Sequence, residues 1–591
     1  MLGFAAVVDL DGAPLTADAA VPLASALAID GTVTVPFRAE GLCGAHLAHP
    51  APLDFDRALP CVGARGAVLF GALRLDAQGD LRRALRTAGT EPPPGAADAE
   101  LAMAAWELWG ERCAERLIGD FAFGIWEPAS RRLTMFRDHH GNRQCYWGRD
   151  GSRLVLASSI EGVRAHAPLA TAWREEAMAA FLRVGYVEDV TGTVWRDVHR
   201  VPPAHVATFS GRGDPRLRRC WEYPVPEPLR YRDGGQYVEG FLAVLGEAVR
   251  DRLRAPTAGI QLSGGLDSPM LAAMVRAVAP QLPLFAQTVS FPRLVPCDDD
   301  QLAPMVARQL GLAHDTLLGD DELPLAWLDD AAPYAPEPLD EPDLGVVRRS
   351  HAALARHAPV MFIGEDGDTL MRPPTLASQV RERGLAEVAT AWWAYWRATG
   401  ARPWIGLEWR ARMRRALGRI PDRTPWLLAG ARAPQSAVAL VSHPVRAPSV
   451  RLLSSPLWDN VYQATAPSYT RAATLPTLPL VDPRVIAFVF AIPAVPWGEH
   501  KTLFREAMRG RLPEAIRTRP KTPLRGYYEA RVAQWRAAGG AVVKLSPRVA
   551  PWVDRARAES ILRDGAPNLA VEAWRVILLD RWMARMEGAR A

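Results

Sequence analysis

Several features common in other protein classes are missing from this sequence. None of its six cysteines form a CxxC pair, so neither a zinc knuckle nor a redox dithiol is predicted. No uncharged apolar run reaches the roughly 18 residues of a membrane span, and Asp9 and Asp11 interrupt the N-terminal run, unlike in a signal peptide. The net charge of +5 is too small to suggest an extended nucleic-acid footprint. We therefore expect a reduced, cytoplasmic protein with neither nucleic-acid nor membrane partners.

The first part of the chain is rich in short strand-like runs. Apolar and alternating patterns predict strands at 4–10, 66–76, 121–127, 132–138, 153–159 and 205–209. Residues 98–120 carry apolar side chains at helical spacing, and we expect them to form a helical pair. The proline- and charge-rich segment 221–235 has the composition of a linker. This part is predicted to be an α+β sandwich.

Beyond the linker, strands and helices alternate. The pattern predicts helices at 236–253, 268–278 and 300–311, and strands at 259–262, 284–291 and 359–364. Such alternation indicates a parallel sheet with helices on both faces, a doubly wound α/β domain. Residues after 375 look mostly helical, with a tryptophan- and arginine-rich stretch at 392–419. The expected fold is a two-domain α/β protein, divided into residues 1–223 and 224–591.

The hexapeptide SGGLDS (263–268) lies between a predicted strand and a predicted helix. Gly264 and Gly265 permit a tight turn whose backbone N–H groups can approach a phosphate, and the helix adds its positive end. Ser263 and Ser268 can donate hydrogen bonds to phosphate oxygens, whereas Asp267 suits such a site only beside Mg²⁺. No GK[ST] follows, so this is not a Walker A loop. The alternative is an ordinary Gly-Gly turn with a capped helix.

SGGLDS resembles the pyrophosphate loop of the asparagine synthetase family, which includes β-lactam synthetase and the lasso-peptide macrolactam cyclases. Further segments are similar to the family's in the same order: TVSF (288–291), the helix at 297–315, GEDGD (364–368), and the C-terminal segments 479–493 and 500–524. The resemblance implies an ATP-pyrophosphatase domain that binds ATP and Mg²⁺. It implies cofactor contacts at Leu262, Ser263, Gly264, Gly265, Asp267, Ser268, Val289, Ser290 and Gly364.

Charged residues in the later segments suggest catalytic roles. GEDGD follows an apolar strand, so Asp368 can face Asp267 across the sheet edge, and two carboxylates suit a Mg²⁺ on the β- and γ-phosphates. The resemblance gives Glu365 a role near the reacting amine, although β-lactam synthetase uses a tyrosine there. It also places Lys501 and Lys521 near the phosphates. The alternatives are that Glu365 and Asp366 are solvated loop acids and that the lysines are ordinary surface charges.

The first domain resembles the family's glutaminase domain, notably over 119–147, but lacks its nucleophile. Such a glutaminase needs a cysteine at its mature N-terminus, whereas this chain has Leu2 there and no cysteine before Cys43. The family's NGEIYN segment is FGALRLD here, with Phe70 in place of the amide side chain. Asp98 matches the amine-binding aspartate but would have nothing to hold. We expect an inactive domain that is a structural remnant or a surface for partner contact.

Without ammonia from glutamine, the activated acyl group must react with another amine. An amine on the same substrate would make the reaction a cyclisation, and the insertion at 392–419 with the PWL (425–427) and RPKTPL (519–524) segments is most similar to lasso-peptide cyclases. The expected partners are then a precursor core peptide, a leader peptidase and a leader-binding protein. A β-lactam synthetase-like or other small-molecule enzyme, a non-catalytic peptide-binding scaffold and a tRNA-modifying ATP pyrophosphatase remain as alternatives.

Overall fold

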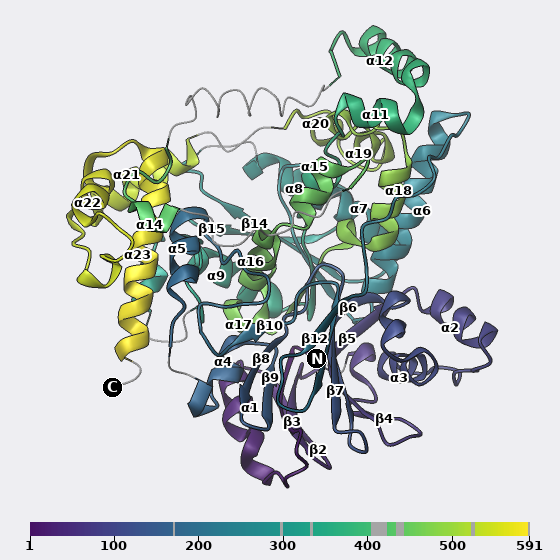
Figure 1. Cartoon of the computed structure of the whole chain (residues 1–591). Coiled ribbons are helices and arrows are strands. Elements are labelled where there is room, and N and C mark those ends of the chain that lie inside the picture. Colours follow the sequence, from purple (N-terminus) through teal and green to yellow (C-terminus); the bar gives the residue numbers. More distant parts are fainter. Residues whose placement is uncertain are drawn as a thin grey trace.

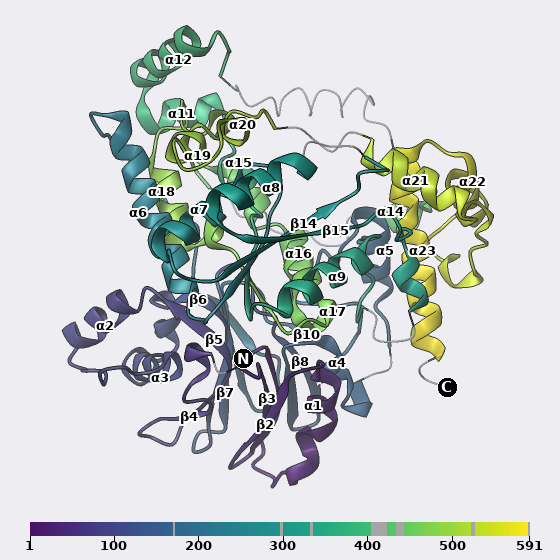
Figure 2. The same ribbon diagram turned by 180° about the vertical axis from the view of Figure 1, so that it is seen from behind.

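The computed structural model describes residues 1–51, 53–169, 172–295, 299–330, 335–403, 422–432, 443–521 and 526–588. These residues form two antiparallel β-sheets followed by one parallel sheet. Figures 1 and 2 show the antiparallel sheets in the lower half of the molecule, with the parallel sheet and its helices above them. No helix in this described part is long and apolar enough to cross a membrane.

The N-terminal domain is a sandwich of two six-stranded sheets. One has the strand order β10-β8-β9-β1-β3-β2 and the other β12-β11-β7-β6-β5-β4. Side chains such as Phe4, Phe70 and Trp126 share one buried cluster between the sheets, as expected where two sheets pack face to face. Helices α1 (Val21–Leu27) and α4 (Ile160–Arg164) cover the first sheet. Helices α2 (Gln78–Thr87) and α3 (Asp98–Trp109) cover the second.

The twelve strands of the sandwich are short to medium in length. The first sheet contains β1 (Gly3–Asp9), β2 (Val33–Ala39), β3 (Leu42–Ala48), β8 (Tyr146–Asp150), β9 (Arg153–Ala157) and β10 (His199–Arg200). The second contains β4 (Cys61–Val62), β5 (Val68–Asp76), β6 (Ile118–Glu127), β7 (Arg132–Arg137), β11 (His205–Ser210) and β12 (Arg216–Arg219).

The C-terminal domain is built on a five-stranded sheet of order β15-β14-β13-β16-β17, with every pair parallel. The strands are β13 (Ala258–Gln261), β14 (Leu284–Ser290), β15 (Ala313–Leu318), β16 (Val360–Phe362) and β17 (Leu475–Thr477). The chain adds β14 and β15 on one side of β13 and then β16 and β17 on the other. This reversal leaves a crevice at the carboxyl ends of β13 and β16, where doubly wound sheets bind ligands.

Helices pack on both faces of this sheet, which confirms the predicted doubly wound arrangement. Those sharing its largest apolar cluster are α6 (Gly234–Arg252), α7 (Asp267–Val278), α8 (Asp299–Leu310), α18 (Pro483–Ala491) and α19 (Thr502–Ala507). On another face, Leu354 of α9 (Leu344–Ala355) packs against Met361. The short segments around the sheet are α10 (Gly367–Leu370), α11 (Leu376–Arg383), α15 (Ala447–Leu453), α16 (Pro456–Thr465), α17 (Pro467–Thr470) and α20 (Glu514–Arg517).

The two domains are joined by apolar packing and buried ion pairs. Helix α5 (Glu175–Val184) shares a core with α14 (Ala429–Arg432), α21 (Tyr527–Ala537), α22 (Arg555–Asp564) and α23 (Pro567–Gly588). Arg137 of β7 contacts Asp459 of α16 at 2.5 Å, and both side chains are buried. On α6, Arg252 lies 3.2 Å from Asp76 of β5. The first domain therefore packs directly against the second.

The sequence expectation differs from the structure in particular elements. The helical pair expected over 98–120 is wrong in its second half, because residues 110–115 form a 3₁₀ turn and Ile118 already begins β6. Strands β2, β3, β4, β8, β10, β12, β15 and β17 were not predicted. Strand β2 contains Pro36 and lies at a sheet edge, where proline is tolerated. The hydrophobic patterns of these unpredicted strands are too short or irregular to distinguish from those of loops.

Candidate active site

A cleft of about 1190 Å³ opens at the carboxyl ends of β13 and β16. Four segments line it: the SGGLDS loop after β13, the GEDGD loop after β16, residues 500–505 and residues 516–521. The two loops follow neighbouring parallel strands, so the fold brings together motifs that lie about a hundred residues apart. Gln287 and Val289 of β14 complete one wall.

The SGGLDS loop turns back on itself before α7 begins at Asp267. The backbone N–H of Ser263 donates to Ser268 Oγ at 3.0 Å, and that of Gly265 donates to Ser263 Oγ at 3.2 Å. Of the predicted cofactor residues, seven line the cleft: Leu262, Ser263, Gly265, Asp267, Ser268, Val289 and Gly364. Gly264 does not, because Arg519 and Asp299 cover it.

Two glycines of GEDGD allow its loop to press against SGGLDS. A Cβ atom on Gly364 would lie 2.7 Å from the backbone nitrogen of Ser268, and one on Gly367 would lie 2.6 Å from Asp267 Cγ. Real Cβ atoms do not approach backbone that closely, so a side chain at Gly364 would push the loops apart. These glycines set the width of the crevice, a role that sequence reasoning did not assign.

Two lysines and two aspartates meet in the cleft. Lys501 Nζ lies 2.5 Å from Asp267 Oδ2 and 2.7 Å from Asp368 Oδ1, while Lys521 Nζ lies 2.5 Å from Asp368 Oδ2. The Lys501 side chain is only 15% exposed, against 72% for Lys521. Lys501 is thus held between the carboxylates, whereas Lys521 reaches in from the rim. The predicted metal ligands and lysines form one cluster.

The charge balance differs from one carboxylate to the next. Burial raises the pKa of Asp267 despite the adjacent Lys501. At Asp368 the opposing effect of burial is outweighed by hydrogen bonds from Lys501 and Lys521, which lower its pKa. Glu365 lines the cleft with an exposed side chain, yet desolvation by the surrounding walls and then the negative charges of Asp267 and Asp368 raise its pKa. Glu365 therefore holds a proton more readily than an ordinary glutamate.

Asp366 differs from the solvated loop acid considered as an alternative above. It is 4% exposed, and the Tyr462 hydroxyl on α16 donates to its Oδ2 at 2.8 Å. Burial raises its pKa to about 7, against the opposing effect of that hydrogen bond. Its φ of +70° lies in the left-handed region. Asp366 thus points into the protein while its neighbour Glu365 points into the cleft.

The backbone is strained where Lys501 enters the site. His500 and Lys501 have φ values of +50° and +57°, a conformation that costs non-glycine residues of the order of 1 kcal/mol each. Arg505 braces this turn by donating from Nε to the His500 carbonyl at 2.8 Å. Left-handed backbone at non-glycine residues is commonly kept at functional sites. The turn aims the Lys501 ammonium at both aspartates.

Two arginines belong to the cleft but were not singled out from the sequence. Arg519 donates to the Gly264 carbonyl at 2.8 Å and pairs with Asp299 at 2.7 Å, so it ties residues 516–521 to the SGGLDS loop. Arg505 lines the cleft beside Lys501. Both lie within segment 500–524, where the resemblance was noted. Their closeness in sequence to Lys501 and Lys521 is the signal that could have identified them.

Val289 and Ser290 of β14 have different surroundings. Val289 lines the cleft, as predicted. The Ser290 side chain is buried, is absent from the lining of the cleft and donates to Asp300 on α8. Strand alternation explains the difference, because consecutive side chains point to opposite faces. Any contact of Ser290 with a cofactor would have to come from its backbone.

The carboxylates suit a divalent cation bound together with phosphates. Within the described ranges no group of three or more His, Cys, Asp or Glu side chains is arranged to hold a metal by itself. Mg²⁺, however, is commonly held by one or two carboxylates with substrate phosphates supplying further oxygens. Asp267 Oδ1 is buried without a hydrogen-bond partner, so it has an acceptor to offer. The donor set fits Mg²⁺ carried in on a nucleotide.

In the first domain, the positions compared above with a glutaminase site are packed or hydrogen-bonded within the protein itself. Leu2 is buried with Leu47 and Phe55 at the start of β1. Cys43 lies in mid-sheet on β3, opposite Val7. Asp98, expected to have nothing to hold, instead accepts hydrogen bonds from the Leu75 backbone, the Gln78 side chain and Arg254, at 2.6, 2.7 and 2.8 Å.

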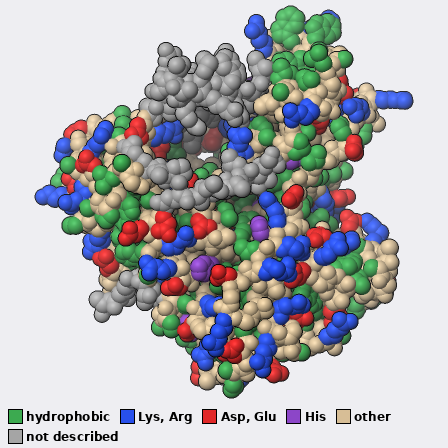
Figure 3. Space-filling model, viewed as in Figure 1, with side chains coloured by type: hydrophobic (Ala, Val, Ile, Leu, Met, Phe, Trp, Pro, Cys, Tyr) green, Lys and Arg blue, Asp and Glu red, His purple; other side chains and the backbone are tan. Residues whose placement is uncertain are grey.

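The tryptophan-rich insertion is described only in part. Helix α12 (Leu385–Thr399) projects from the top of the molecule in Figure 1, and its tip forms an apolar patch in Figure 3. Trp393 and Trp396 are 56% and 52% exposed, whereas Trp392 donates to Gln379. The described tryptophans do not line the cleft. Trp404, Trp409, Arg410 and Arg412 lie outside the described residues.

Comparison with known proteins gives the family. A model of asparagine synthase matches residues 240–584, more than half of the chain, and one of a glutamine amidotransferase domain matches residues 77–221. Amidase chyE of Penicillium rubens is 28% identical over 292 residues, 46% of this chain and 42% of that protein. A putative glutamine-hydrolyzing asparagine synthetase of Mycobacterium bovis is 27% identical over 299 residues, 49% of this chain and 45% of that protein.

A third relative, glutamine-hydrolyzing asparagine synthetase 3 of Bacillus subtilis, is 26% identical over 197 residues, 33% of this chain and 31% of that protein. The chain thus spans less than half the length of these curated relatives. The asparagine synthase match covers the whole cleft, from SGGLDS to Lys521. By that match, the chain is a member of the asparagine synthase family.

Proposed function

We propose that the protein forms an amide bond by converting a carboxylate into its AMP ester at the expense of ATP. One observation carries this proposal: Lys501 contacts both Asp267 and Asp368 beside the SGGLDS loop. Such an arrangement at the carboxyl edge of a parallel sheet suits a nucleoside triphosphate and its divalent cation. Membership of the asparagine synthase family supports the same reaction type.

In the first half-reaction, the substrate carboxylate attacks the α-phosphorus of ATP and pyrophosphate leaves. Mg²⁺ held by Asp267 and Asp368 would neutralise charge on the phosphates. Backbone N–H groups of the SGGLDS loop and the start of α7 would bind phosphate oxygens. Lys501 and Lys521 would stabilise the negative charge that develops on the departing pyrophosphate.

In the second half-reaction, an amine attacks the acyl carbon and AMP leaves. Glu365 is the proposed acceptor of the amine's proton, because it lines the cleft and its pKa is raised toward that of a useful base. Lys521, at the rim, would stabilise the tetrahedral intermediate. Glu365 therefore acts only in the second half-reaction, whereas Lys521 acts in both, which makes their roles separable by experiment.

The proposed substrate is a core peptide and the proposed product a lasso-type macrolactam. ATP would activate an Asp or Glu side chain, and the peptide's own N-terminal amine would close the ring. Leu2, Phe70 and the occupied Asp98 support an internal amine rather than ammonia from glutamine. The volume of the cleft, about 1190 Å³, exceeds that of small-molecule pockets, which run to roughly 1,000 Å³. A leader peptidase and a leader-binding protein would supply the freed peptide.

A small-molecule amide-forming enzyme is the second candidate. The similarity to the amidase chyE of Penicillium rubens favours it, and the described part of α12 does not extend the cleft toward a peptide. A scaffold that only binds a peptide is disfavoured, because it would have no use for the strained turn that aims Lys501 at Asp267 and Asp368.

The deciding experiment measures pyrophosphate exchange into ATP with candidate substrates. A leaderless peptide with a free N-terminus and an internal Asp or Glu should support exchange and then lose one water by mass spectrometry. The same peptide with an acetylated N-terminus should support exchange but stay linear. Exchange with aspartate plus ammonium or with a small β-amino acid, and none with peptides, would replace the cyclase by the small-molecule enzyme.

A further inference from the structure

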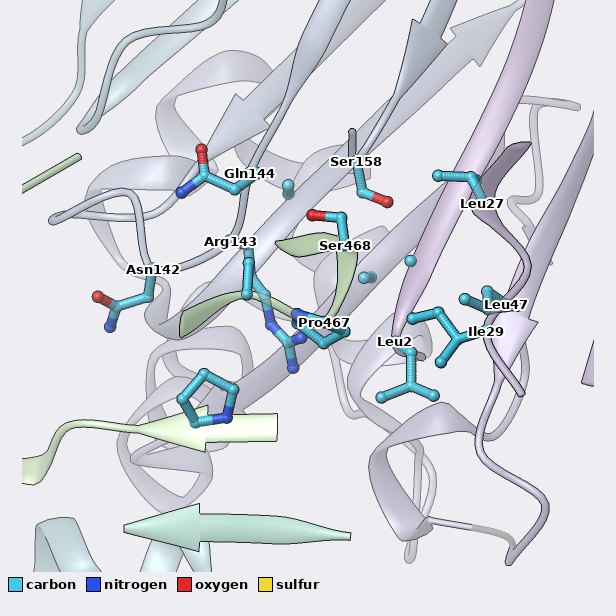
Figure 4. Close-up of a pocket in the computed structure, with 15 residues that line it drawn as sticks. Leu2, Leu27, Ile29, Leu47, Asn142, Arg143, Gln144, Ser158, Pro467 and Ser468 are labelled. Atoms are coloured by element: carbon cyan, nitrogen blue, oxygen red, sulfur yellow. The ribbon is translucent and has the colours of Figure 1, made fainter. Parts of the chain in front are cut away.

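A second, much smaller pocket of about 40 Å³ lies between the two domains and shares no lining residue with the cleft. Leu2, Leu47 and Arg143 line it from the sandwich, and Pro467, Ser468 and Pro476 line it from α17 and β17 of the second domain. Figure 4 shows these residues, with the side chain of Arg143 extending toward the end that Pro467 and Leu2 line. Residues of both domains therefore line one pocket.

The charge on Arg143 is not neutralised by a direct contact. Its guanidinium has no hydrogen bond or ion pair with any residue that the structure describes. Burial lowers its pKa to about 10. The Arg143 side chain is partly exposed and lines the pocket, and proteins usually pair a charge in such surroundings. The unpaired guanidinium can therefore bind an anion in the pocket.

The nearest carboxylates are engaged elsewhere. Asp120 accepts from Arg74 at 2.8 Å and from the Asn142 side chain at 3.1 Å. Asp138 accepts four backbone N–H groups, at 2.9 to 3.2 Å, within its own loop and the start of β6. Neither carboxylate can turn to Arg143 without giving up buried hydrogen bonds, each of which is costly to lose.

The pocket is polar at one end and apolar at the other. Arg143 supplies the positive charge, while Leu2, Leu27, Ile29 and Leu47 form an aliphatic wall. One water requires about 10–15 Å³ measured in the same way, so 40 Å³ holds about three or four waters or a small ion of similar size. A carboxylate group matches the flat fork of a guanidinium, and a one- or two-carbon chain matches the aliphatic wall.

We propose that this interdomain pocket binds a short aliphatic carboxylate, of the size of acetate or propionate, through Arg143. The ligand would pair its carboxylate with the guanidinium and place its alkyl chain against Leu2 and Leu47. It would touch both domains and so stabilise their contact. The proposal does not depend on the reaction proposed for the cleft.

The test measures thermal unfolding of the full chain with sodium acetate, propionate or hexanoate. Ionic strength is held constant with sodium gluconate, whose anion is too large to enter. Wild type is compared with Arg143→Met, which keeps the length of the side chain without its charge. Arg149→Met is the matched control, since Arg149 donates to the Gly211 and Gly213 carbonyls on an exposed turn, away from the pocket.

Acetate and propionate should raise the Tm of wild type and Arg149→Met saturably, by about 2 °C or more, and hexanoate should not. Arg143→Met should show no such shift, because it removes the charge that pairs with the carboxylate. An equal shift in Arg143→Met, or no shift in wild type, would overturn the proposal. If Arg143→Met does not fold, equilibrium dialysis of wild type with radiolabelled acetate decides: one saturable site per chain is expected, and none refutes it.

Discussion

Charged side chains have different surroundings in the cleft of the second domain and in the interior of the first. In the cleft, Lys501 and Lys521 meet Asp267 and Asp368 where solvent and a substrate can reach them. In the interior of the first domain, by contrast, one group of charges is buried and paired. Arg74 contacts Asp76 at 2.9 Å and Asp120 at 2.8 Å, and all three side chains are at most 3% exposed.

The difference indicates which charges are available for chemistry. A buried pair with no access to solvent holds structure, and removing one partner leaves the other unpaired at high cost. A pair in an open cleft can exchange its partner for a phosphate or a metal ion. Charged groups thus serve packing in the first domain and, as proposed above, chemistry in the second. Each experiment below tests one side of this comparison.

The largest effect is expected from the aspartates of the cleft. Asp267→Ala and Asp368→Ala should each reduce pyrophosphate release by the order of 10²-fold or more, since each removes an electrostatic contact inside the site. Asp315→Ala, an exposed aspartate on β15, should leave the rate unchanged. Circular dichroism should show both cleft variants to be folded. Normal turnover by both would show that the cluster does not hold the nucleotide.

Glu365→Gln should separate the two half-reactions. Loss of a general base slows proton transfer by about 10²-fold or more, so amide formation should fall steeply while pyrophosphate exchange stays within about threefold of wild type. Lys521→Ala should impair both. In wild type, amide formation should also be lost as pH falls through the raised pKa of Glu365, because only its carboxylate form accepts a proton. Equal losses of exchange and amide formation in Glu365→Gln would remove it as the base.

The general layout of the cleft could be predicted from sequence because each motif directly follows a strand. SGGLDS comes after β13 and GEDGD after β16, and parallel strands bring their carboxyl ends to one edge. Asp267 and Asp368 were expected to face one another, and the observed contacts of both with Lys501 fit that geometry. Local sequence order was sufficient for this inference.

Other features depend on contacts that no local pattern encodes. Arg254 reaches Asp98 across the domain boundary, 156 positions away in the chain, so Asp98 looked unoccupied in the sequence. Asp366 is buried against Tyr462 of α16. Its charged neighbours in GEDGD suggested instead a solvent-exposed loop residue. Helix α12 could be predicted as apolar and helical, but its position away from the cleft follows from tertiary packing.

Asp366 should make stability depend on pH. Its pKa is raised to about 7 in the folded chain, against about 3.9 in an unfolded one. Between these values the folded state binds one more proton, so the free energy of unfolding falls as pH rises from about 4 to 7, by up to about 1.4 kcal/mol per unit. Asp366→Asn, which also tolerates a positive φ, should show a smaller decline.

The measurement is Tm or urea unfolding at pH 5, 6, 7 and 8 for wild type and Asp366→Asn. Asp315→Asn, which alters an exposed aspartate, controls for loss of a charge alone and should parallel wild type. If the wild-type and Asp366→Asn curves run parallel between pH 5 and 7, Asp366 is ionised throughout. The buried pair with Tyr462 would then be an ordinary charged hydrogen bond.

The smallest effect is expected on glutamine hydrolysis, which a single substitution should not restore. We predict that wild type releases no glutamate from glutamine above background, and that Leu2→Cys, with Met1 removed so that the new residue carries the free amine, does not restore release. A thiol alone is insufficient, because Asp98 is already engaged by Arg254 and Phe70 packs against Phe4 and Phe37 where the family has an amide side chain. The smaller side chain should also lower stability by about 2–4 kcal/mol, since Leu2 is buried among Leu47, Phe55 and Leu475. Glutamate formation by the variant that is abolished by heat would show that the first domain retains a working glutamine site, and the contrast between the two domains would then rest on a single residue.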